Sequence, residues 1–288
     1  MSVSRFVPES IVPSKSILKK MSDVLMGVDR FVVLTGAGVS TESGIPDYRS
    51  AKVGQYARSG YKPVEFADFM SSERWRQRYW ARNYVAWPRF SSAECNINHR
   101  TIAKWEQSDR FVWLITQNVD GLHLRAGSKL VTELHGSGHR VKCMSCGAIF
   151  PRTEVQQWIR DLNKDWLVTE IGEMAPDGDV PIPEKAVSSF QLPHCPNCGP
   201  GSILKTDVVF FGDIIPEADI FTCYDKIDES DGMIVLGSSL AVMSGYRFVQ
   251  YAASRDMPII IVNIGPTRAD HLATVKIAAK CSDVICHI

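Results

Sequence analysis

The sequence lacks both a long apolar segment and an excess of charge of either sign. Hydrophobic residues make up 45% of its 288 residues, yet no run approaches the roughly 20 apolar residues that a membrane-spanning helix needs. The 32 Lys and Arg residues equal the 32 Asp and Glu residues, which argues against nucleic acid or an anionic membrane as a partner. We therefore expect a globular protein with no nucleic-acid and no membrane partner, long enough to bury a full core.

An export signal is also missing, since residues 1–20 contain no apolar core of the required length. This stretch is more basic than acidic and contains several serines. That composition is compatible with a short mitochondrial targeting segment and equally with a frayed terminus.

Four of the eight cysteines form two CxxC pairs, Cys143 with Cys146 and Cys195 with Cys198. Paired CxxC motifs in a chain without an export signal favour metal binding in a reducing compartment over a disulfide framework. Four thiolates complete a tetrahedral shell, which suits a structural zinc ion and leaves no position for water or substrate. Unmetallated cysteines or a redox dithiol are the alternative. The long segment between the pairs must leave the zinc module and return to it.

A glycine turn follows a short apolar run near the start of the chain. Residues 31–34 read FVVL, and residues 36–50 read GAGVSTESGIPDYRS. A buried strand that ends at Gly-Ala-Gly is typical of a backbone that approaches a phosphate. Thr41 stands where a standard dinucleotide fingerprint has its third glycine. Nucleotide binding is the favoured interpretation, and a plain strand-to-helix turn is the alternative.

Further apolar runs alternate with helical segments, which predicts a doubly wound, Rossmann-like α/β fold with a parallel sheet. The expected strands are residues 31–34, 111–116, 208–211, 232–236, 258–263 and 284–287. The expected helices are residues 14–27, 73–87, 99–107, 216–227 and 244–255. Because ligands in such folds bind at the carboxyl ends of the strands, the loops after residues 35, 116, 236 and 263 should face one crevice.

Two stretches interrupt this alternation and predict a smaller lobe over the crevice. Residues 52–98 read as a helical insertion rich in aromatic residues, and residues 140–202 as a zinc-binding module with an extended loop. We expect an N-terminal segment at 1–29 that contains a helix, and a Rossmann-like domain built from 30–51, 99–139 and 203–288.

Polar residues also follow the second expected strand, in TQNVDGLH at 116–123. Gln117, Asn118 and Asp120 would face the crevice, where amides and a carboxylate suit a ribose or a carboxamide. A helix-capping turn is the alternative. His135 follows in TELHGS; an imidazole near a crevice can serve as a general base, although most histidines are structural.

Together these motifs resemble those of sirtuins, the NAD-dependent protein lysine deacylases. The resemblance runs from Phe31 to the C-terminus and adds VVFFGD at 208–213, GSSLAV at 237–242 and VNIGPT at 262–267, all in the order found in that family. The segments YWARN at 79–83 and APDGDV at 175–180 are most similar to the class II mitochondrial branch, which contains the fourth mammalian sirtuin.

The resemblance implies a role for each matching residue. His135 would be the general base, with Asn118 and Asp120 beside it in catalysis. The substrate peptide would lie between the loop after Leu240 and the strip Val209, Phe210, Phe211 and Gly212, as an added strand. The NAD-binding residues would be Gly36, Ala37, Gly38, Ser40, Asp47, Tyr48, Arg49, Tyr56, Gln117, Asn118, Val119, Asp120, Gly237, Ser238, Ser239, Asn263, Ile264, Gly265 and Cys281.

The implied reaction consumes NAD as a co-substrate, while one zinc ion is structural. The acyl-lysine carbonyl oxygen displaces nicotinamide, and His135 then deprotonates a ribose hydroxyl, which attacks the resulting imidate. The products are nicotinamide, free lysine and O-acyl-ADP-ribose. The expected partners are acyl-lysine proteins, mainly metabolic enzymes of the mitochondrial matrix. Protein mono-ADP-ribosyl transfer and a zinc-knuckle protein that only senses NAD are the alternatives.

The chain departs from the family pattern at two places. Most sirtuins carry a proline where this chain has Ser244, which restores a backbone N–H and adds a hydroxyl. Tyr48 stands where phenylalanine is commoner, and its extra hydroxyl is expected to find a partner near the cofactor. Tyr79 and Arg82 lie at i and i+3 of an expected helix and resemble a device that reads acidic acyl groups. We therefore expect a preferred acyl group other than acetyl, one that carries a carboxylate. A solvated helix face is the alternative. The segment 175–180 is expected to reach back to the acyl tunnel.

Overall fold

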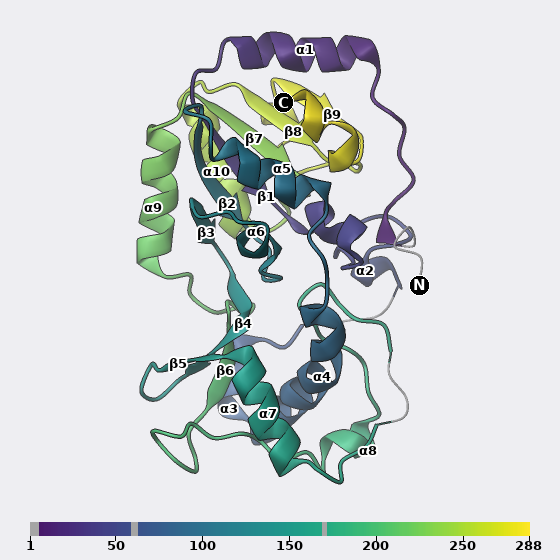
Figure 1. Cartoon of the computed structure of the whole chain (residues 1–288), viewed down its shortest axis with the longest axis vertical. Helices are drawn as coiled ribbons and strands as arrows, with labels where there is room; N and C mark the ends of the chain where they lie inside the picture. The colour runs from purple at the N-terminus through teal and green to yellow at the C-terminus, as the bar shows by residue number, and fades with distance from the viewer. Residues whose placement is uncertain (1–5, 59–62, 169–171) are drawn as a thin grey trace.

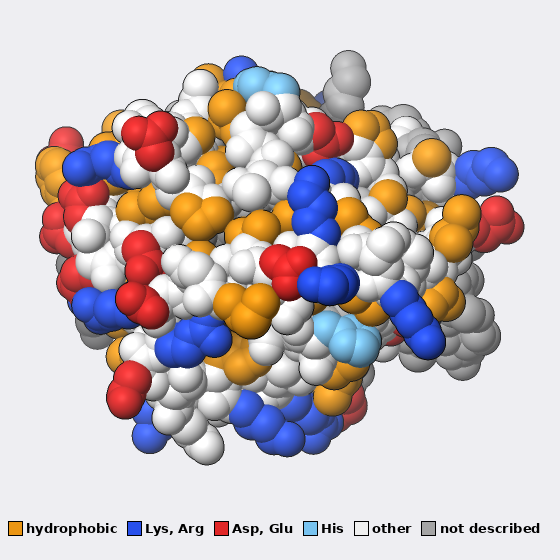
Figure 2. Space-filling model, turned by 90° about the horizontal axis from the view of Figure 1, so that it is seen from above, with side chains coloured by type: hydrophobic (Ala, Val, Ile, Leu, Met, Phe, Trp, Pro, Cys, Tyr) orange, Lys and Arg blue, Asp and Glu red, His pale blue; other side chains and the backbone are white. Residues whose placement is uncertain are grey.

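The computed structural model describes residues 6–58, 63–168 and 172–288. Its larger lobe contains a six-stranded sheet, and a smaller lobe contains a three-stranded sheet (Figure 1). Among the described residues, no helix is both long and apolar enough to cross a bilayer. Basic and acidic side chains are interspersed on the face seen in Figure 2, in keeping with the balanced composition.

The larger sheet is parallel throughout, as its buried, β-branched runs predict. All residues of the strands β1 (Phe31–Thr35), β7 (Gly232–Leu236) and β8 (Ile259–Val262) are buried. The strand order is β3 (Val131–Glu133), β2 (Phe111–Thr116), β1 (Phe31–Thr35), β7 (Gly232–Leu236), β8 (Ile259–Val262) and β9 (Val275–Ile277).

Helices cover both faces of this sheet and bury two separate cores. The helices α1 (Lys15–Met26) and α5 (Ile97–Trp105) pack with Val33 of β1 on one face. The helices α9 (Glu217–Asp228) and α10 (Met243–Ser254) pack with Val32 and Leu34 on the other. Successive side chains of a strand point to opposite faces, so one short apolar run supplies both cores.

The smaller lobe is held by an antiparallel sheet and the helices that pack on it. The sheet order is β5 (Ile149–Pro151), β4 (Gly136–Cys143) and β6 (Leu204–Val208). The helices are α3 (Phe66–Ser71), α4 (Glu73–Ser91), α7 (Arg152–Leu162) and α8 (Glu184–Val187). A buried guanidinium joins α7 to α4, since Arg152 donates to Asn83 Oδ1 at 2.8 and 3.0 Å and lies over the rings of Trp80 and Trp87.

The remaining elements are short helical turns. The turn after β1 is the 3₁₀ helix η2 (Ala37–Ser43), and two single helical turns follow, α2 (Gln55–Arg58) and α6 (Leu122–Arg125). Near the C-terminus lie the 3₁₀ helices η3 (Asp270–Leu272), η4 (Cys281–Asp283) and η5 (Ile285–His287).

Four of the six expected strands are confirmed in the large sheet, and two predictions are wrong. Residues 285–287 form the 3₁₀ turn η5 with Val284 as its N-cap, and β9 is the edge strand next to β8. Of residues 208–211, only Val208 is in a strand, at the end of β6 in the small antiparallel sheet. The five expected helices are confirmed with shifts of up to a few residues at their ends, while α7 was not anticipated.

Candidate active site

One cavity of about 1590 Å³ lies at the carboxyl ends of the parallel strands. The loops after β1, β2, β7 and β8 form part of its wall, so the expectation that they face one crevice is confirmed. The segment after β6 and the start of α10 also line it. Typical small-molecule pockets occupy about 300–1,000 Å³, so this cavity has room for a dinucleotide and a peptide side chain together.

The glycine turn after β1 lies directly against the turn after β7. The N–H of Gly38 donates to the carbonyl of Gly237 at 2.8 Å. A Cβ on Gly36 would lie 2.8 Å from Cβ of Ser238, so a larger residue does not fit there. Gln117 joins the second loop to this pair by donating to Ser238 Oγ at 2.8 Å. Bare backbone thus forms this part of the wall, as close approach to a diphosphate requires.

A buried hydrogen-bond network orders the polar residues after β1 and β2. Ser40 donates to Asp120 Oδ2 at 2.7 Å, and Asn118 donates to Ser40 Oγ at 3.1 Å. His99 of α5 supplies the next link. Its Nδ1 accepts from the Asn96 N–H at 3.3 Å, so Nε2 carries the proton and donates to Ser40 at 3.2 Å. Burial lowers the pKa of His99 to about 4, which keeps this ring neutral.

The segment from Asp47 to Tyr56 forms another part of the wall. Asp47 stabilises its turn by accepting the Arg49 N–H at 3.0 Å. The Arg49 guanidinium lies 5.2 Å from the centroid of the Tyr56 ring, and the Tyr48 ring lies 5.6 Å from the same ring. Burial, together with the carboxylate of Asp177, raises the pKa of Tyr48 well above its usual value. The loop containing Asp177 therefore approaches the segment that was expected to hold the cofactor.

The adenosine side of the expected site lies after β8. Lys276 donates to the carbonyls of Asn263 and Gly265 at 2.9 Å each, which fixes this loop at the cavity wall. Burial raises the pKa of Cys281 to about 12, so it remains a thiol and is no nucleophile.

His135 lies in the same wall, between β3 and β4, and both of its ring nitrogens have partners. Nδ1 lies 3.0 Å from the carbonyl of Gln117, and Nε2 lies 2.8 Å from Ser244 Oγ. Burial lowers the pKa of His135, against the opposing effect of the Gln117 carbonyl. The neighbouring Gly136 has φ +74°, and a Cβ there would lie 1.9 Å from the carbonyl oxygen of Asp207. A neutral imidazole in this position can accept a proton.

The strip after β6 joins the histidine to the other side of the cavity. The N–H of Val209 donates to the His135 carbonyl at 2.8 Å, and the carbonyl of Phe211 accepts from the Phe66 N–H at 2.9 Å. Phe211 is 45% exposed, and Ile214 and Met243 are also exposed at the rim. These residues give the cavity mouth an apolar rim on the side that was expected to hold a peptide.

Tyr79 and Arg82, both on α4, differ in their position relative to the cavity. Tyr79 lines the cavity and its hydroxyl bonds to Thr206 Oγ1 at 2.5 Å. Arg82 does not line the cavity: its Nε lies 2.9 Å from Asp179 Oδ1 and donates to the Val180 carbonyl at 2.8 Å. Arg82 is only 6% exposed, so a solvated helix face is ruled out for this residue. Asp179 itself lines the cavity, so the segment 175–180 lies between Arg82 and the open space.

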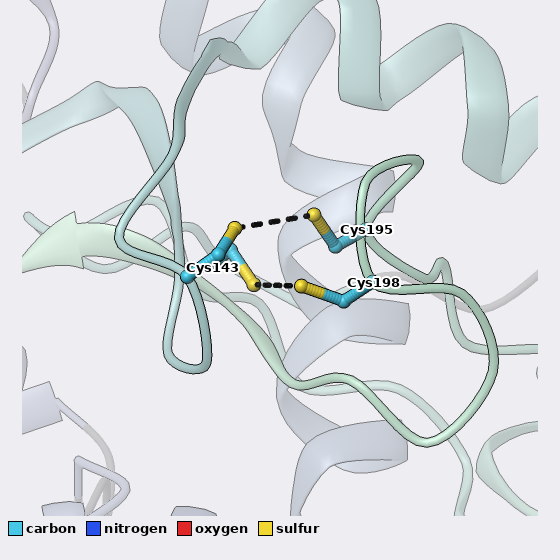
Figure 3. Close-up of side chains that lie close together, drawn as sticks. Cys143, Cys195 and Cys198 are labelled. Carbon is cyan, nitrogen blue, oxygen red and sulfur yellow. Dashed lines mark hydrogen bonds between the residues drawn. The ribbon is translucent and has the colours of Figure 1, made fainter.

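The four cysteines converge in the smaller lobe, outside the cavity wall (Figure 3). All four Sγ atoms lie within 4.8 Å of one another. The pair Cys143–Cys198 is separated by 3.9 Å and Cys146–Cys195 by 3.8 Å. A tetrahedral ion with Zn–S bonds of about 2.3 Å places its sulfurs about 3.8 Å apart. The cluster therefore fits one structural zinc ion.

The cavity wall contains, besides His135, every residue that the sequence suggested for NAD or peptide binding apart from Arg82. Sequence reasoning missed two contributions. Val7, Pro8 and Glu9 of the N-terminal segment line the cavity, although nothing in that stretch suggests a ligand. His99 was not predicted as a site residue either. Only its place on an expected helix could have indicated that it contacts Ser40.

Comparison with known proteins gives a consistent result. A family model described as the Sir2 family matches residues 36–244. The chain is 53% identical over 283 residues to the NAD-dependent protein deacylase sir-2.2 of Caenorhabditis elegans, covering 98% of both chains. It is 46% identical to the mitochondrial NAD-dependent protein lipoamidase sirtuin-4 of Homo sapiens, covering 99% of this chain and 90% of that protein.

The solved structures agree with these sequences. A structure of Sir2 with a p53 peptide and NAD+ superposes with a TM-score of 0.69 at 29% identity and covers 94% of this chain and 95% of that one. With this fold, a family model that matches residues 36–244 and relatives that match nearly its full length, the chain belongs to the Sir2 family, the sirtuins.

Proposed function

We propose that the protein is an NAD-dependent protein deacylase that removes acyl groups from lysine side chains, with a preference for acyl groups other than acetyl. The observation that carries this proposal is the position of His135, whose ring lies in one wall with the glycine turn and the strip after β6. The relatives reported above are named NAD-dependent protein deacylase and lipoamidase.

Different residues of the cavity suit different parts of NAD and different steps of the reaction. The backbone of Gly36 and Gly38 suits the diphosphate of NAD, and Asn118 and Asp120 suit its ribose and carboxamide. When bound, NAD supplies the electrophilic ribose carbon that accepts the acyl oxygen. His135 receives the proton of a ribose hydroxyl at Nε2, since the Gln117 carbonyl holds the other proton at Nδ1.

The acyl chain would extend past Tyr79 towards the segment 175–180. In this structure Asp179 already pairs with Arg82, so Arg82 does not present an unpaired guanidinium to an incoming acyl chain. Long neutral acyl groups, such as the lipoyl group, then fit without breaking a contact. An acyl group that ends in a carboxylate would have to take the place of Asp179 on Arg82, as Arg and carboxylate pair strongly.

The alternatives receive less support. The names of the relatives refer to deacylation and lipoamide cleavage, so protein mono-ADP-ribosyl transfer is not favoured. A protein that only senses NAD would have no use for a neutral, tautomerically fixed histidine beside the peptide strip.

The cellular setting follows from the relatives. The sirtuin-4 proteins of Homo sapiens and Bos taurus are named mitochondrial, which indicates a mitochondrial location for this chain as well. We further propose the matrix as its compartment, acyl-lysine forms of metabolic enzymes as its substrates, and the division into lobes at the boundaries given above.

The test is a panel of peptides that carry one lysine as its acetyl, lipoyl or glutaryl derivative, incubated with the protein and NAD. We expect nicotinamide and deacylated peptide to form in every active case, with the highest kcat/KM for lipoyl-lysine. Equal kcat/KM for all three peptides would refute the acyl preference. ADP-ribose bound to protein, without free lysine, would refute deacylation itself.

A further inference from the structure

The hydroxyl of Ser244 lies against Nε2 of His135, the ring nitrogen that would accept the proton in catalysis. Ser244 Oγ lies 2.8 Å from Nε2, and both residues line the cavity. The hydrogen bond joins the second residue of α10 to the segment between β3 and β4, more than a hundred residues away in sequence. This contact exists only because the chain has a serine where the family pattern has a proline.

The other nitrogen decides which tautomer is present. Nδ1 lies 3.0 Å from the carbonyl of Gln117, and a carbonyl can only accept a hydrogen bond. Nδ1 therefore carries the proton of the neutral ring, and Nε2 presents a lone pair. Ser244 must then donate its hydroxyl proton to Nε2. Both bonds together fix the rotation of the ring and its tautomer.

The backbone that presents Ser244 is itself tightly held. The next residue, Gly245, is buried, and a Cβ there would lie 2.5 Å from Oε1 of Gln117. The start of α10 is thus packed against the same residue whose carbonyl holds Nδ1. Tyr246 and Phe248 anchor the helix in the core beneath the sheet. Ser244 has a short side chain on a fixed backbone, so its hydroxyl has little freedom to leave Nε2.

We propose that Ser244 is the positioning residue for the base of this enzyme: in the tautomer that the Gln117 carbonyl selects, it holds the His135 ring in the rotation that presents the Nε2 lone pair, and it gives up its place at Nε2 to the ribose hydroxyl of NAD. The inference rests on the deacylase function proposed above and adds a residue to it.

The proton balance is simple. In the reactive complex the ribose O–H replaces the serine O–H as donor to Nε2. The ribose O–H bond then breaks, its proton forms the N–H bond at Nε2, and its electron pair attacks the imidate carbon. The serine oxygen can accept a hydrogen bond from the new N–H, because a hydroxyl serves as donor or acceptor. Ser244 is therefore paired with Nε2 in the free protein and can pair with it again after the transfer.

The test separates this role from a general effect on the pocket. Release and exchange of nicotinamide precede the step that needs the base, whereas formation of deacylated peptide follows it. Ser244→Ala should lower the rate of deacylated-peptide formation about tenfold, as expected for a misplaced base. Exchange of labelled nicotinamide into NAD should change by less than about twofold, and Ser244→Thr should restore most of the deacylation.

The matched control is Ser254→Ala, which removes a hydroxyl from the opposite end of α10, where Ser254 bonds only to the Tyr251 carbonyl among the contacts described. It should leave both rates unchanged. The proposal is overturned if Ser244→Ala deacylates as fast as the parent or faster, or if exchange and deacylation fall by the same factor. A parent protein that does not exchange nicotinamide at all would instead contradict the proposed function.

Discussion

Arg82 and Asp179 form a buried ion pair at the end of the cavity, with Nε and Oδ1 2.9 Å apart and side chains that are 7% and 8% exposed. The two residues come from the helical insertion and from the extended loop of the zinc module, which are nearly a hundred residues apart. Because Asp179 lines the cavity and Arg82 does not, the chain's own carboxylate lies between the guanidinium and the open cavity.

The first prediction concerns acyl selectivity. Asp179→Asn keeps a hydrogen-bond acceptor beside Arg82 but removes the competing charge, so the ratio of glutaryl to lipoyl turnover should rise several-fold. Arg82→Met should lower the same ratio, and the loss should be larger when it is introduced together with Asp179→Asn. The measurement is kcat/KM for the two acyl-peptides, with thermal unfolding to exclude loss of fold, since breaking a buried pair can cost about 3–5 kcal/mol.

A ratio that stays constant across these three variants would show that neither residue reads the acyl group.

The second prediction concerns acid stability. Burial lowers the pKa of His99 to about 4 and also lowers the pKa values of His123 and His135. At a pH between the folded-state and the unfolded-state pKa of such a histidine, the unfolded chain binds a proton that the folded protein does not. The free energy of unfolding should therefore be highest above about pH 6.5 and should decrease as the pH falls towards 4. His99 alone should account for a loss of stability on the order of 3 kcal/mol over this range, at about 1.4 kcal/mol per pKa unit.

The check is the free energy of unfolding by urea at several pH values between 7.5 and 4.5. His99→Gln should flatten the pH dependence, while a substitution of His194, which is exposed, should not. An unfolding free energy that is constant over this range would contradict the assignment of buried neutral histidines.

The third prediction concerns the metal. Purified protein should contain one zinc ion per chain, and Cys195→Ala should lose it, because Cys195 is buried within the cluster. Loss of zinc should lower the melting temperature and abolish activity by unfolding the smaller lobe. Cys286→Ala, at an exposed cysteine far along the chain, is the control and should retain the metal. Zinc content that is unaffected by Cys195→Ala would contradict this site.

The fourth prediction concerns the N-terminal segment. Phe6 is 3% exposed, and the guanidinium of Arg89 lies 5.9 Å from the centroid of its ring. The residues that follow it line the cavity. Phe6→Ala should release this segment and raise the KM for NAD several-fold with little change in kcat. Ile11→Ala is the control, since Ile11 is 83% exposed in the same segment. Equal KM values for both variants would place the segment outside the cofactor site.

Sequence patterns could predict those parts of the site that depend on local rules. Gly36 and Gly38 follow a buried strand, and Gln117 follows the neighbouring one, so parallel pairing brings them to one edge. The paired cysteines could be predicted from their spacing alone. By contrast, the contact of Arg82 with Asp179 depends on how an irregular loop folds back, which no periodicity records.

The errors have the same origin. The apolar run at 284–287 has the composition of a strand, but tertiary packing gives the edge of the sheet to β9. Val7 lines the cavity because the N-terminal segment begins near the cavity. From there the chain runs along the side of the larger lobe, from near α2 to α1, as Figure 1 shows. The bond between Ser244 and His135 likewise joins distant segments, although the departure from proline marked that position.

The most direct test of the central claim is the stoichiometry of a single reaction mixture that contains the protein, NAD and a lipoyl-lysine peptide. The account predicts one nicotinamide and one O-acyl-ADP-ribose for each free lysine. His135→Ala should give no net formation of any of the three products, although it should still exchange labelled nicotinamide into NAD. Free lysine that forms without NAD, or full turnover by His135→Ala, would contradict it.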